Sequence, residues 1–334
     1  MQQRQLGSDG PRVSAVGIGA MSFTDFYGPT NEQNSHAVLD AAMRLGIDHI
    51  DTANVYGMGH SERTIGSFLA ARGAEARDHF RIATKAAITR DPDTGARCFN
   101  NSAAHLEAEL DGSLRRLGIE AVDLFYVHRR NPAIEIEAVT ETLAGFIKAG
   151  KIRAFGFSEI APHTLRRAAA VHPVAAVQSE YSLQTRAPEL GLVQECTRQG
   201  AALVAFSPVG RGLLSDTPPT PETIGDSGFL AGNPRFTGEN LTANLAATDA
   251  FRALAAEMQT AAASLAIAWV LAQGPHVIAI PGTRSVEHLE ELAAGAALDL
   301  TDDDLARIES LLPVGWAAGD RYSESQSVGP ERYS

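Results

Sequence analysis

The chain has 334 residues, of which 44% are hydrophobic and 20% are charged, and its formal net charge is −12 at pH 7. This acidic balance argues against a nucleic acid or an anionic membrane surface as a partner, because both repel negative charge. The chain has two cysteines, Cys98 and Cys196, which are too far apart for a C-x-x-C motif, and it shows no signal peptide and no apolar run of membrane-spanning length. We therefore expect a cytoplasmic protein that does not enter a membrane.

The N-terminal region predicts a hairpin followed by a strand and a helix. Residues 3–6 and 12–13 fit two short strands on either side of a turn at residues 7–11, and residues 13–20 form an apolar run. Residues 31–45 place apolar side chains at three- and four-residue spacing, which is typical of an amphipathic helix. Gly46 follows where a helix C-cap glycine belongs.

Short strands and helices then alternate to the end of the chain. After the strand at 13–20, the expected strands end at Asp51, Lys85, His128, Ser158, Gln178, Ser207 and Ile280. The expected helices cover about 60–72, 102–117, 135–149, 162–170, 189–199, 241–271 with a break near Thr260, 286–294 and 301–312. A long loop through 91–95 follows the strand that ends at Lys85, residues 210–239 form a second loop rich in Gly, Pro and Thr, and residues 315–334 form a polar tail.

This alternation predicts the α/β class and a single domain over residues 1–334, built as a (β/α)8 TIM barrel with a C-terminal helix and tail. An open doubly wound sheet is the alternative. It usually carries a G-x-G-x-x-G turn after its first strand, and Gly17-Ile18-Gly19 lacks the third glycine. The barrel is therefore favoured.

Four polar residues fall at the rim where such a barrel carries its active site: Asp51, Tyr56, Lys85 and His128. A tyrosine has a pKa near 10 in water, and an ammonium such as that of Lys85 within hydrogen-bond reach lowers it. Asp51 would keep the lysine charged, and His128 would orient a carbonyl. Each residue alone has a purely structural explanation, but the four together favour a proton-donating Tyr56.

Several segments, in this order, carry a resemblance to a known family: residues 51–57, Lys85, and residues 124–129, 148–153, 178–183, 207–212 and 280–283. They are similar to the signature segments of the aldo-keto reductase superfamily, and the likeness runs from about Arg4 to Tyr322. The resemblance implies a barrel closed at its base by the N-terminal hairpin. It also implies metal-free, reversible, NADPH-dependent reduction of an aldehyde or ketone, in which nicotinamide C4 gives a hydride and Tyr56 gives a proton.

The same resemblance implies the cofactor residues. Ser158 and Gln178 hold the carboxamide, and Phe206 either stacks under the nicotinamide ring or packs in the core. Small residues at 207–212 suit a pyrophosphate, and Arg284 at the start of the last barrel helix suits a 2′-phosphate; a flexible loop and a surface arginine are the alternatives. The further cofactor residues are Ser207, Pro208, Val209, Gly210, Gly212, Ile280, Pro281, Gly282, Thr283, His288 and Glu291.

Three departures from the family pattern concern the cofactor. Glu159 replaces the usual asparagine after Ser158, and its carboxylate cannot both donate and accept as an amide does. Gly282 stands where many members carry a phosphate-binding lysine, and Leu292 follows Glu291 where the family often has asparagine. NADP is therefore the expected cofactor, with NAD kept as an alternative.

Glu159 and the segments 178–186 and 233–240 are similar to a pyridoxal-reductase-like branch of microbial and plant enzymes. The candidates for the substrate wall are Met21, Tyr27, Val55, Phe99, Arg129 and Tyr181. Core packing is an alternative for Met21 and Val55. Arg129 would meet either an anionic substrate or a neighbouring carboxylate.

The leading hypothesis is thus an NADPH-dependent carbonyl reductase that acts on a small molecule. A cofactor-binding regulatory protein on the same barrel, similar to potassium-channel β subunits, is the alternative from another class. A metal-dependent barrel hydrolase is less favoured, because His49, His60 and His128 do not form the His-x-His pattern of such sites, so no metal is expected. The sequence leaves the oligomeric state open.

Overall fold

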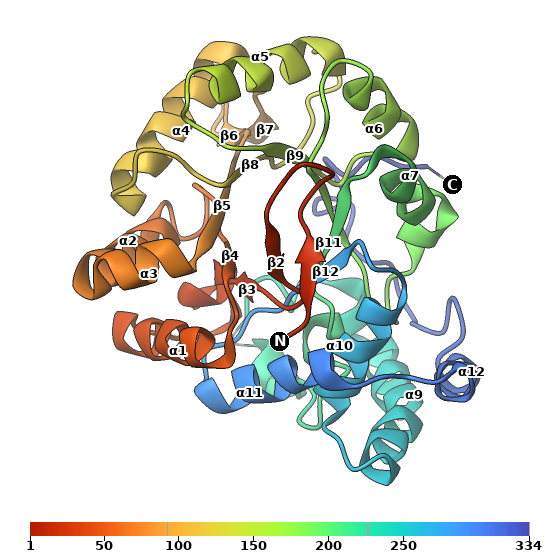
Figure 1. The fold of residues 1–334 in the computed structure, drawn as a ribbon. Helices are drawn as coiled ribbons and strands as arrows, with labels where there is room; N and C mark the ends of the chain where they lie inside the picture. The colour runs from red at the N-terminus through yellow and green to blue at the C-terminus, as the bar shows by residue number, and fades with distance from the viewer. Residues whose placement is uncertain (92, 226, 334) are drawn as a thin grey trace.

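The computed structural model describes residues 1–91, 93–225 and 227–333. Pro92 in the expected loop after Lys85, Asp226 in the 210–239 segment and Ser334 at the end of the tail lie outside the described residues. The centre is an eight-stranded parallel sheet in the order β12-β11-β10-β9-β8-β5-β4-β3. A parallel bridge between Val16 and Ala279 joins its two ends, so the predicted (β/α)8 barrel is confirmed (Figure 1).

The barrel strands are short and almost fully buried, as expected for parallel strands that are covered on both faces. They are β3 (Ile18–Gly19), β4 (His49–Asp51), β5 (Arg81–Ala86), β8 (Leu124–Val127), β9 (Phe155–Ser158), β10 (Ala176–Glu180), β11 (Ala202–Phe206) and β12 (Val277–Ile280). Each expected strand is present within a few residues of its predicted position.

Helices surround the barrel (Figure 1). They are α1 (Glu32–Leu45), α2 (His60–Arg72), α3 (Ala74–His79), α4 (Ala103–Leu117), α5 (Ile136–Lys148), α6 (Pro162–Ala169), α7 (Leu192–Gln199), α8 (Pro221–Gly225), α9 (Gly238–Glu257), α10 (Ala262–Ala272), α11 (Val286–Ala294) and α12 (Asp302–Leu311). Local signals set several ends. Asn31 caps α1 by accepting from the amide of Asn34, Gly46 ends it at a φ of 71°, and Thr301 forms a capping box with Asp304 in α12.

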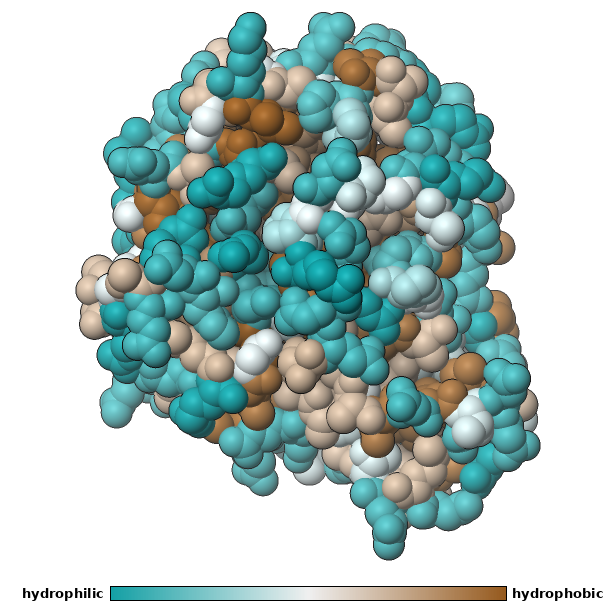
Figure 2. Space-filling view, in the orientation of Figure 1, coloured by the Kyte–Doolittle hydropathy of each residue, from teal (hydrophilic) through white to brown (hydrophobic). Residues whose placement is uncertain are grey.

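The N-terminal hairpin consists of β1 (Gln3–Gln5) and β2 (Arg12–Ser14), which pair antiparallel. Leu6 and Val13 are fully buried and pack with barrel-interior side chains such as Val204 and Ile278. Figure 1 looks onto this end and shows the hairpin across the middle of the barrel. The predicted closure of the base is confirmed. Figure 2 shows that this face is mostly hydrophilic, with hydrophobic side chains in small separate patches.

Two segments differ from the expectations. The predicted loop after β5 contains a second hairpin, β6 (Ile88–Arg90) with β7 (Arg97–Phe99). Asp91 stabilises its turn by accepting from the amide and the hydroxyl of Thr94, an interaction that the sequence pattern did not reveal. The helix expected from residue 189 begins at Leu192, because residues 187–190 form a separate 3-10 turn.

The 210–239 segment holds only short helical turns, which are η4 (Gly210–Gly212), α8 and η5 (Pro234–Phe236). Residues 315–333 contain no helix or strand. Among the described helices none is by itself long and apolar enough for a membrane span. One bent pair, α9 with α10, meets the length and composition criterion at an angle of 92°.

Candidate active site

Neighbouring strands bring Asp51, Lys85 and His128 to one end of the barrel, because β4 pairs with β5 and β5 pairs with β8. Lys85 is fully buried and its Nζ forms an ion pair with Asp51. The same Nζ donates to the carbonyl of Thr52 at 2.8 Å and to the hydroxyl of Tyr56 at 3.2 Å. The catalytic set that the sequence predicted is therefore assembled around one ammonium group.

Tyr56 reaches this group from the turn between β4 and α2. The amide of Tyr56 donates to the carbonyl of Ala53 at 3.1 Å, and Gly57 has a φ of 57°. A Cβ at Gly57 would lie 2.9 Å from Cβ of His60, so this position requires glycine. The turn leaves the phenol edge-on to the His128 ring, with 5.8 Å between the ring centroids.

The charges of the set follow from burial and pairing. Burial acts to lower the pKa of Lys85, but Asp51 and Tyr56 outweigh burial and raise the pKa above its usual value. Lys85 therefore stays charged, as expected. Burial raises the pKa of Tyr56; Lys85 acts in the opposite direction without cancelling it, and Asp51 raises it further. Lys85 thus acts to lower the pKa of the phenol, as predicted, but burial of the phenol is the stronger effect and the net shift is upward.

His128 is neutral at physiological pH. Burial lowers its pKa well below 6.5, and the positive charges of Arg129, Lys85 and Arg97 lower it further. Its Nδ1 is buried and has no hydrogen-bond partner among the described residues. A neutral imidazole carries one N–H, so His128 can donate one hydrogen bond to a carbonyl oxygen without transferring a charge.

The expected nicotinamide residues lie next to this set. Gln178 of β10 lies opposite Ser158 of β9, at the last pair that joins the two strands. Its Nε2 donates to Asp51 at 2.7 Å. Ser158 is buried at the end of β9, and its hydroxyl accepts from Arg129. Phe206 is half-buried at the end of β11, so its ring is not sealed in the core. Gln178 beside Asp51 and Ser158 beside Arg129 are therefore placed to hold an amide group.

The loop after β11 fits an anion. Ser207, Gly210, Arg211 and Gly212 have positive φ values of 50°, 58°, 56° and 97°, so the backbone turns tightly, and the amides of Gly210 and Gly212 donate within the turn to the carbonyls of Ser207 and Val209. Gln184 lies against Gly210, and its Nε2 is buried without a partner among the described residues. An unused donor beside such a turn suits a pyrophosphate. Of the other predicted residues of this loop, Pro208 is buried and Val209 is half-buried.

The start of α11 provides a second site for an anion. Ser285 caps this nine-residue helix by accepting from the amide of His288, and the hydroxyl of Thr283 accepts from the amide of Ser285. Arg284 and His288 are exposed, and Arg284 forms no ion pair with the described residues. Its Nη1 donates to the carbonyl of Pro29. A free cation at a helix N-terminus fits a phosphate.

The other predicted residues of this segment have backbone roles. Ile280 and Pro281 are buried, and Pro281 accepts a hydrogen bond from the amide of Gly19 at 2.9 Å. A Cβ at Gly282 would lie 2.8 Å from the carbonyl oxygen of Gly19, which explains why no larger residue stands there. Glu291 is half-buried and its carbonyl accepts from Ser264.

The residues expected to contact substrate divide into two groups. Met21, Tyr27, Val55 and Phe99 are half-buried, and Arg129 is buried beside His128. The prediction that Tyr181 contacts the substrate is wrong. It is fully buried, its hydroxyl donates to Glu189 at 3.0 Å, and its ring packs against Trp269 of α10. Tyr181 therefore belongs to the layer between the barrel and its outer helices and does not line the mouth.

A buried charge network explains the unusual Glu159. Glu159 accepts from Arg321 of the tail at 2.6 Å and from the amide of Glu180 at 2.8 Å. Glu180 in turn pairs with Arg211 at 2.8 Å. Burial acts to raise the pKa of Glu180, but Arg211, Arg321 and Arg235 outweigh it and lower the pKa below its usual value. Glu180 therefore stays charged, and Glu159 holds the tail through its ion pair with Arg321.

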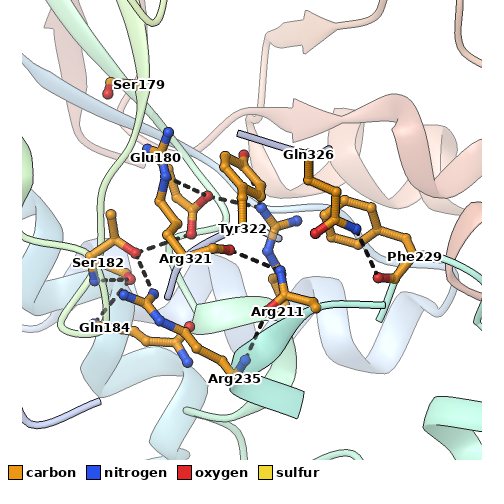
Figure 3. A network of polar contacts seen from close by, with 12 residues as sticks. Ser179, Glu180, Ser182, Gln184, Arg211, Phe229, Arg235, Arg321, Tyr322 and Gln326 are labelled. Atoms are coloured by element: carbon orange, nitrogen blue, oxygen red, sulfur yellow. Dashed lines mark hydrogen bonds and ion pairs between the residues drawn. The ribbon is translucent and has the colours of Figure 1, made fainter. Parts of the chain in front are cut away.

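The sequence gave no sign of this network, because Glu159 and Arg321 are 162 residues apart. The ring of Tyr322 lies beside the guanidinium groups of Arg321 and Arg211, at 4.5 and 5.5 Å (Figure 3). A second anchor lies further along the tail, where Glu331 pairs with Arg130 and accepts from the amide of Ala161. The tail is thus attached by ion pairs at both ends.

Comparison with known proteins identifies the family. The model of the Aldo/keto reductase family matches residues 15–313. The chain is 36% identical over 322 residues to "Aldo-keto reductase yakc [NADP(+)]" of Schizosaccharomyces pombe, covering 96% of this chain and 94% of that protein. It is also 36% identical over 325 residues to "Probable aldo-keto reductase 1" of Glycine max, covering 96% and 92%.

Solved structures agree with this assignment. The glycerol dehydrogenase AKR11B4 from Gluconobacter oxydans superposes with a TM-score of 0.80 at 29% identity, over 93% of this chain and 94% of that one. The holo form of the aldo-keto reductase AKR11C1 from Bacillus halodurans gives a TM-score of 0.75 at 25% identity, over 98% and 99%. The chain, with the Asp51, Tyr56, Lys85 and His128 arrangement at its barrel mouth, belongs to the aldo/keto reductase family.

Proposed function

We propose that this chain reduces an aldehyde or ketone to the alcohol with NADPH, and that Tyr56 is the proton donor. The observation that carries the proposal is the single buried ammonium of Lys85, which contacts both the Asp51 carboxylate and the Tyr56 hydroxyl. Family membership supports the oxidoreductase class, and the relative named yakc [NADP(+)] supports the cofactor.

The four residues divide the work at the carbonyl. NADPH, when bound, supplies the hydride. Neutral His128 donates a hydrogen bond to the carbonyl oxygen and holds it near the Tyr56 hydroxyl, which transfers its proton to that oxygen. An alkoxide is a far stronger base than a phenolate, so this transfer is favourable even though burial raises the pKa of Tyr56. Lys85, kept charged by Asp51, stabilises the phenolate that remains.

The other residues of the site hold the cofactor. Ser158 and Gln178 bind the carboxamide, and Phe206 stacks on the nicotinamide. The turn at residues 207–212 binds the pyrophosphate, and the segment 280–284 with α11 binds the adenosine end. Arg284, which has no ion-pair partner among the described residues, binds the 2′-phosphate and so favours NADP over NAD.

The specific carbonyl is a narrower question. The resemblance to the pyridoxal-reductase-like branch makes pyridoxal one candidate, and the structural neighbour from Gluconobacter oxydans is named a glycerol dehydrogenase, which acts on a small polyol. A panel that includes pyridoxal, glyceraldehyde and 4-nitrobenzaldehyde would rank these substrate types.

The test of the proton donor is Tyr56→Phe. We expect NADPH binding, followed by fluorescence, to stay within about twofold of wild type, while kcat/KM for 4-nitrobenzaldehyde falls by about 10²–10⁴, the usual contribution of general acid catalysis. Tyr181→Phe is the matched control, because it removes the same hydroxyl from a tyrosine bonded to Glu189 instead of Lys85. Turnover by Tyr56→Phe near the wild-type rate would refute the assignment. Tight NADPH binding without turnover of any carbonyl would favour the regulatory alternative.

A further inference from the structure

Arg129 follows the catalytic histidine and is buried, with 9% of its surface exposed. Its Nη1 donates to the carbonyl of His128 at 2.6 Å and to the hydroxyl of Ser158 at 3.0 Å. Its Nε is buried and has no partner, and no carboxylate among the described residues lies within ion-pair distance of its guanidinium. A buried arginine is normally paired, because an uncompensated buried charge is costly.

A second cation, the exposed Arg97, lies on the neighbouring hairpin. Arg97 of β7 stacks over Phe99, with 5.2 Å from its guanidinium carbon to the ring centroid. Phe99 and Arg129 both lie against Gly329, which places the Arg97–Phe99 pair near Arg129. Arg97 has no ion-pair partner among the described residues either.

Three carboxylates at this end of the barrel are paired with other cations. Asp51 pairs with Lys85, and the tail network holds Glu180 with Arg211 and Glu159 with Arg321. The mouth of the barrel therefore carries uncompensated positive charge in a protein whose net charge is −12. This local charge is not explained by the proton donor or by any contact within the described chain.

The tail covers this cationic group on one side. Gly329 lies against Phe99 and Arg129, and a Cβ at this position would be 2.7 Å from the Phe99 ring and 3.1 Å from Cδ of Arg129. The contact presses on the aliphatic part of Arg129 and adds no acceptor to the guanidinium. The Nε of Arg129 thus keeps its free donor, on the same guanidinium whose Nη1 contacts Ser158 and His128.

From these observations we infer that the carbonyl substrate carries a carboxylate, and that Arg129, together with Arg97, binds it beside the carbonyl received by His128 and Tyr56. A carboxylate accepts two parallel hydrogen bonds from a guanidinium and neutralises its charge. A neutral aldehyde would leave that charge uncompensated. The inference rests on the proposed carbonyl reduction and narrows its substrate to oxo acids.

The test compares two aldehydes of similar size that differ in charge, 4-formylbenzoate and the intrinsically more electrophilic methyl 4-formylbenzoate, together with the 2- and 3-isomers of each. For at least one isomer pair we expect wild-type kcat/KM to favour the carboxylate by tenfold or more. Arg129→Met should bring that ratio to within about twofold of one, and Arg129→Lys should restore part of it. Arg97→Met should reduce the ratio several-fold.

Arg90→Met is the matched control. Arg90 pairs directly with Arg97 across the β6–β7 hairpin and carries the same charge, but its Nη1 donates to the carbonyl of Gly95 and it is not among the charges that shift His128. Its removal should leave the substrate ratio unchanged. A ratio that falls equally in Arg90→Met would mean that the preference comes from general surface charge, and would overturn the assignment to Arg129.

Other outcomes would also overturn the inference. Wild-type turnover of the esters as fast as the carboxylates in all three isomer pairs would refute the substrate class while leaving carbonyl reduction intact. Weaker NADPH binding by Arg129→Met with an unchanged substrate ratio would assign the arginine to the cofactor. A binding measurement tests the anion site without turnover. By calorimetry, the NADP-loaded wild-type protein should bind benzoate at least tenfold more tightly than benzamide, and Arg129→Met should lose this preference. Equal binding would refute the anion site even if no aldehyde were reduced.

Discussion

The buried pair of Asp51 and Lys85 allows a quantitative test of how the active site is held together. Lys85→Met replaces the ammonium with a side chain of similar length and leaves Asp51, which is 2% exposed, with Gln178 as its remaining side-chain donor. Asp51→Asn leaves the fully buried ammonium with the Thr52 carbonyl and the Tyr56 hydroxyl. Each single substitution therefore strands a charge in the barrel interior.

Removing one partner of a buried ion pair typically costs about 3–5 kcal/mol, whereas replacing both charges by neutral groups costs much less. The double variant Asp51→Asn/Lys85→Met still loses the donor to the Thr52 carbonyl, and an unsatisfied buried acceptor costs about 1–3 kcal/mol. We therefore expect the sum of the two single losses in the free energy of unfolding to exceed the loss in the double variant by at least about 3 kcal/mol. All three variants should lose carbonyl reduction, because each removes part of the catalytic set.

Urea unfolding followed by circular dichroism would measure the four free energies. The half-buried surface pair of Lys151 and Asp111, whose Nζ and Oδ1 are 2.8 Å apart, is the control. Its cycle, with Lys151→Met and Asp111→Asn, should give a coupling below about 1 kcal/mol. If the losses from Lys85→Met and Asp51→Asn instead add to that of the double variant within about 0.5 kcal/mol, the reasoning from buried charge is refuted.

Two further predictions concern pH and the tail. Burial and the neighbouring cations hold the pKa of His128 well below 6.5, so as the pH falls the unfolded chain takes up this proton before the folded chain does. The contribution of His128 to the free energy of unfolding is therefore fully present above about pH 6.5. It is lost as the pH falls below that value, by up to about 1.4 kcal/mol per pH unit. His128→Gln should flatten the stability curve between about pH 6.5 and 5 in urea titrations, and an unchanged slope would contradict this. Arg321→Met should lower the free energy of unfolding by about 2 kcal/mol, because it removes charged hydrogen bonds from buried Glu159. The control Arg332→Met, on the same tail, should change the free energy of unfolding by no more than about 0.5 kcal/mol. Equal effects of the two substitutions would refute the role of the network.

The elements of this fold could be predicted because their signals are local. The cap at Asn31, the glycine at Gly46 and the capping box at Thr301 lie within a few residues of the helix ends that they define. The catalytic residues could be predicted for a related reason. Parallel barrel strands all end at the same rim, so polar residues at strand ends, such as Lys85, meet whatever their separation along the chain.

The properties that the sequence could not supply depend on distant partners and on burial. Tyr181 follows a strand end as a wall residue would, but the packing of α10 encloses it. Glu159 is explained only by the tail, through Arg321. The raised pKa of Tyr56 depends on how much water the folded barrel excludes.

The sequence by itself therefore determined the order of strands and helices, the barrel and the meeting of Asp51, Lys85 and His128 at one rim, because helix capping, hydrophobic periodicity and strand ends are properties of short segments. Only the tertiary structure decided which charges are compensated. That question depends on every group packed around a site, and it separates Lys85, neutralised by Asp51, from Arg129, which has no carboxylate partner among the residues that the structure describes.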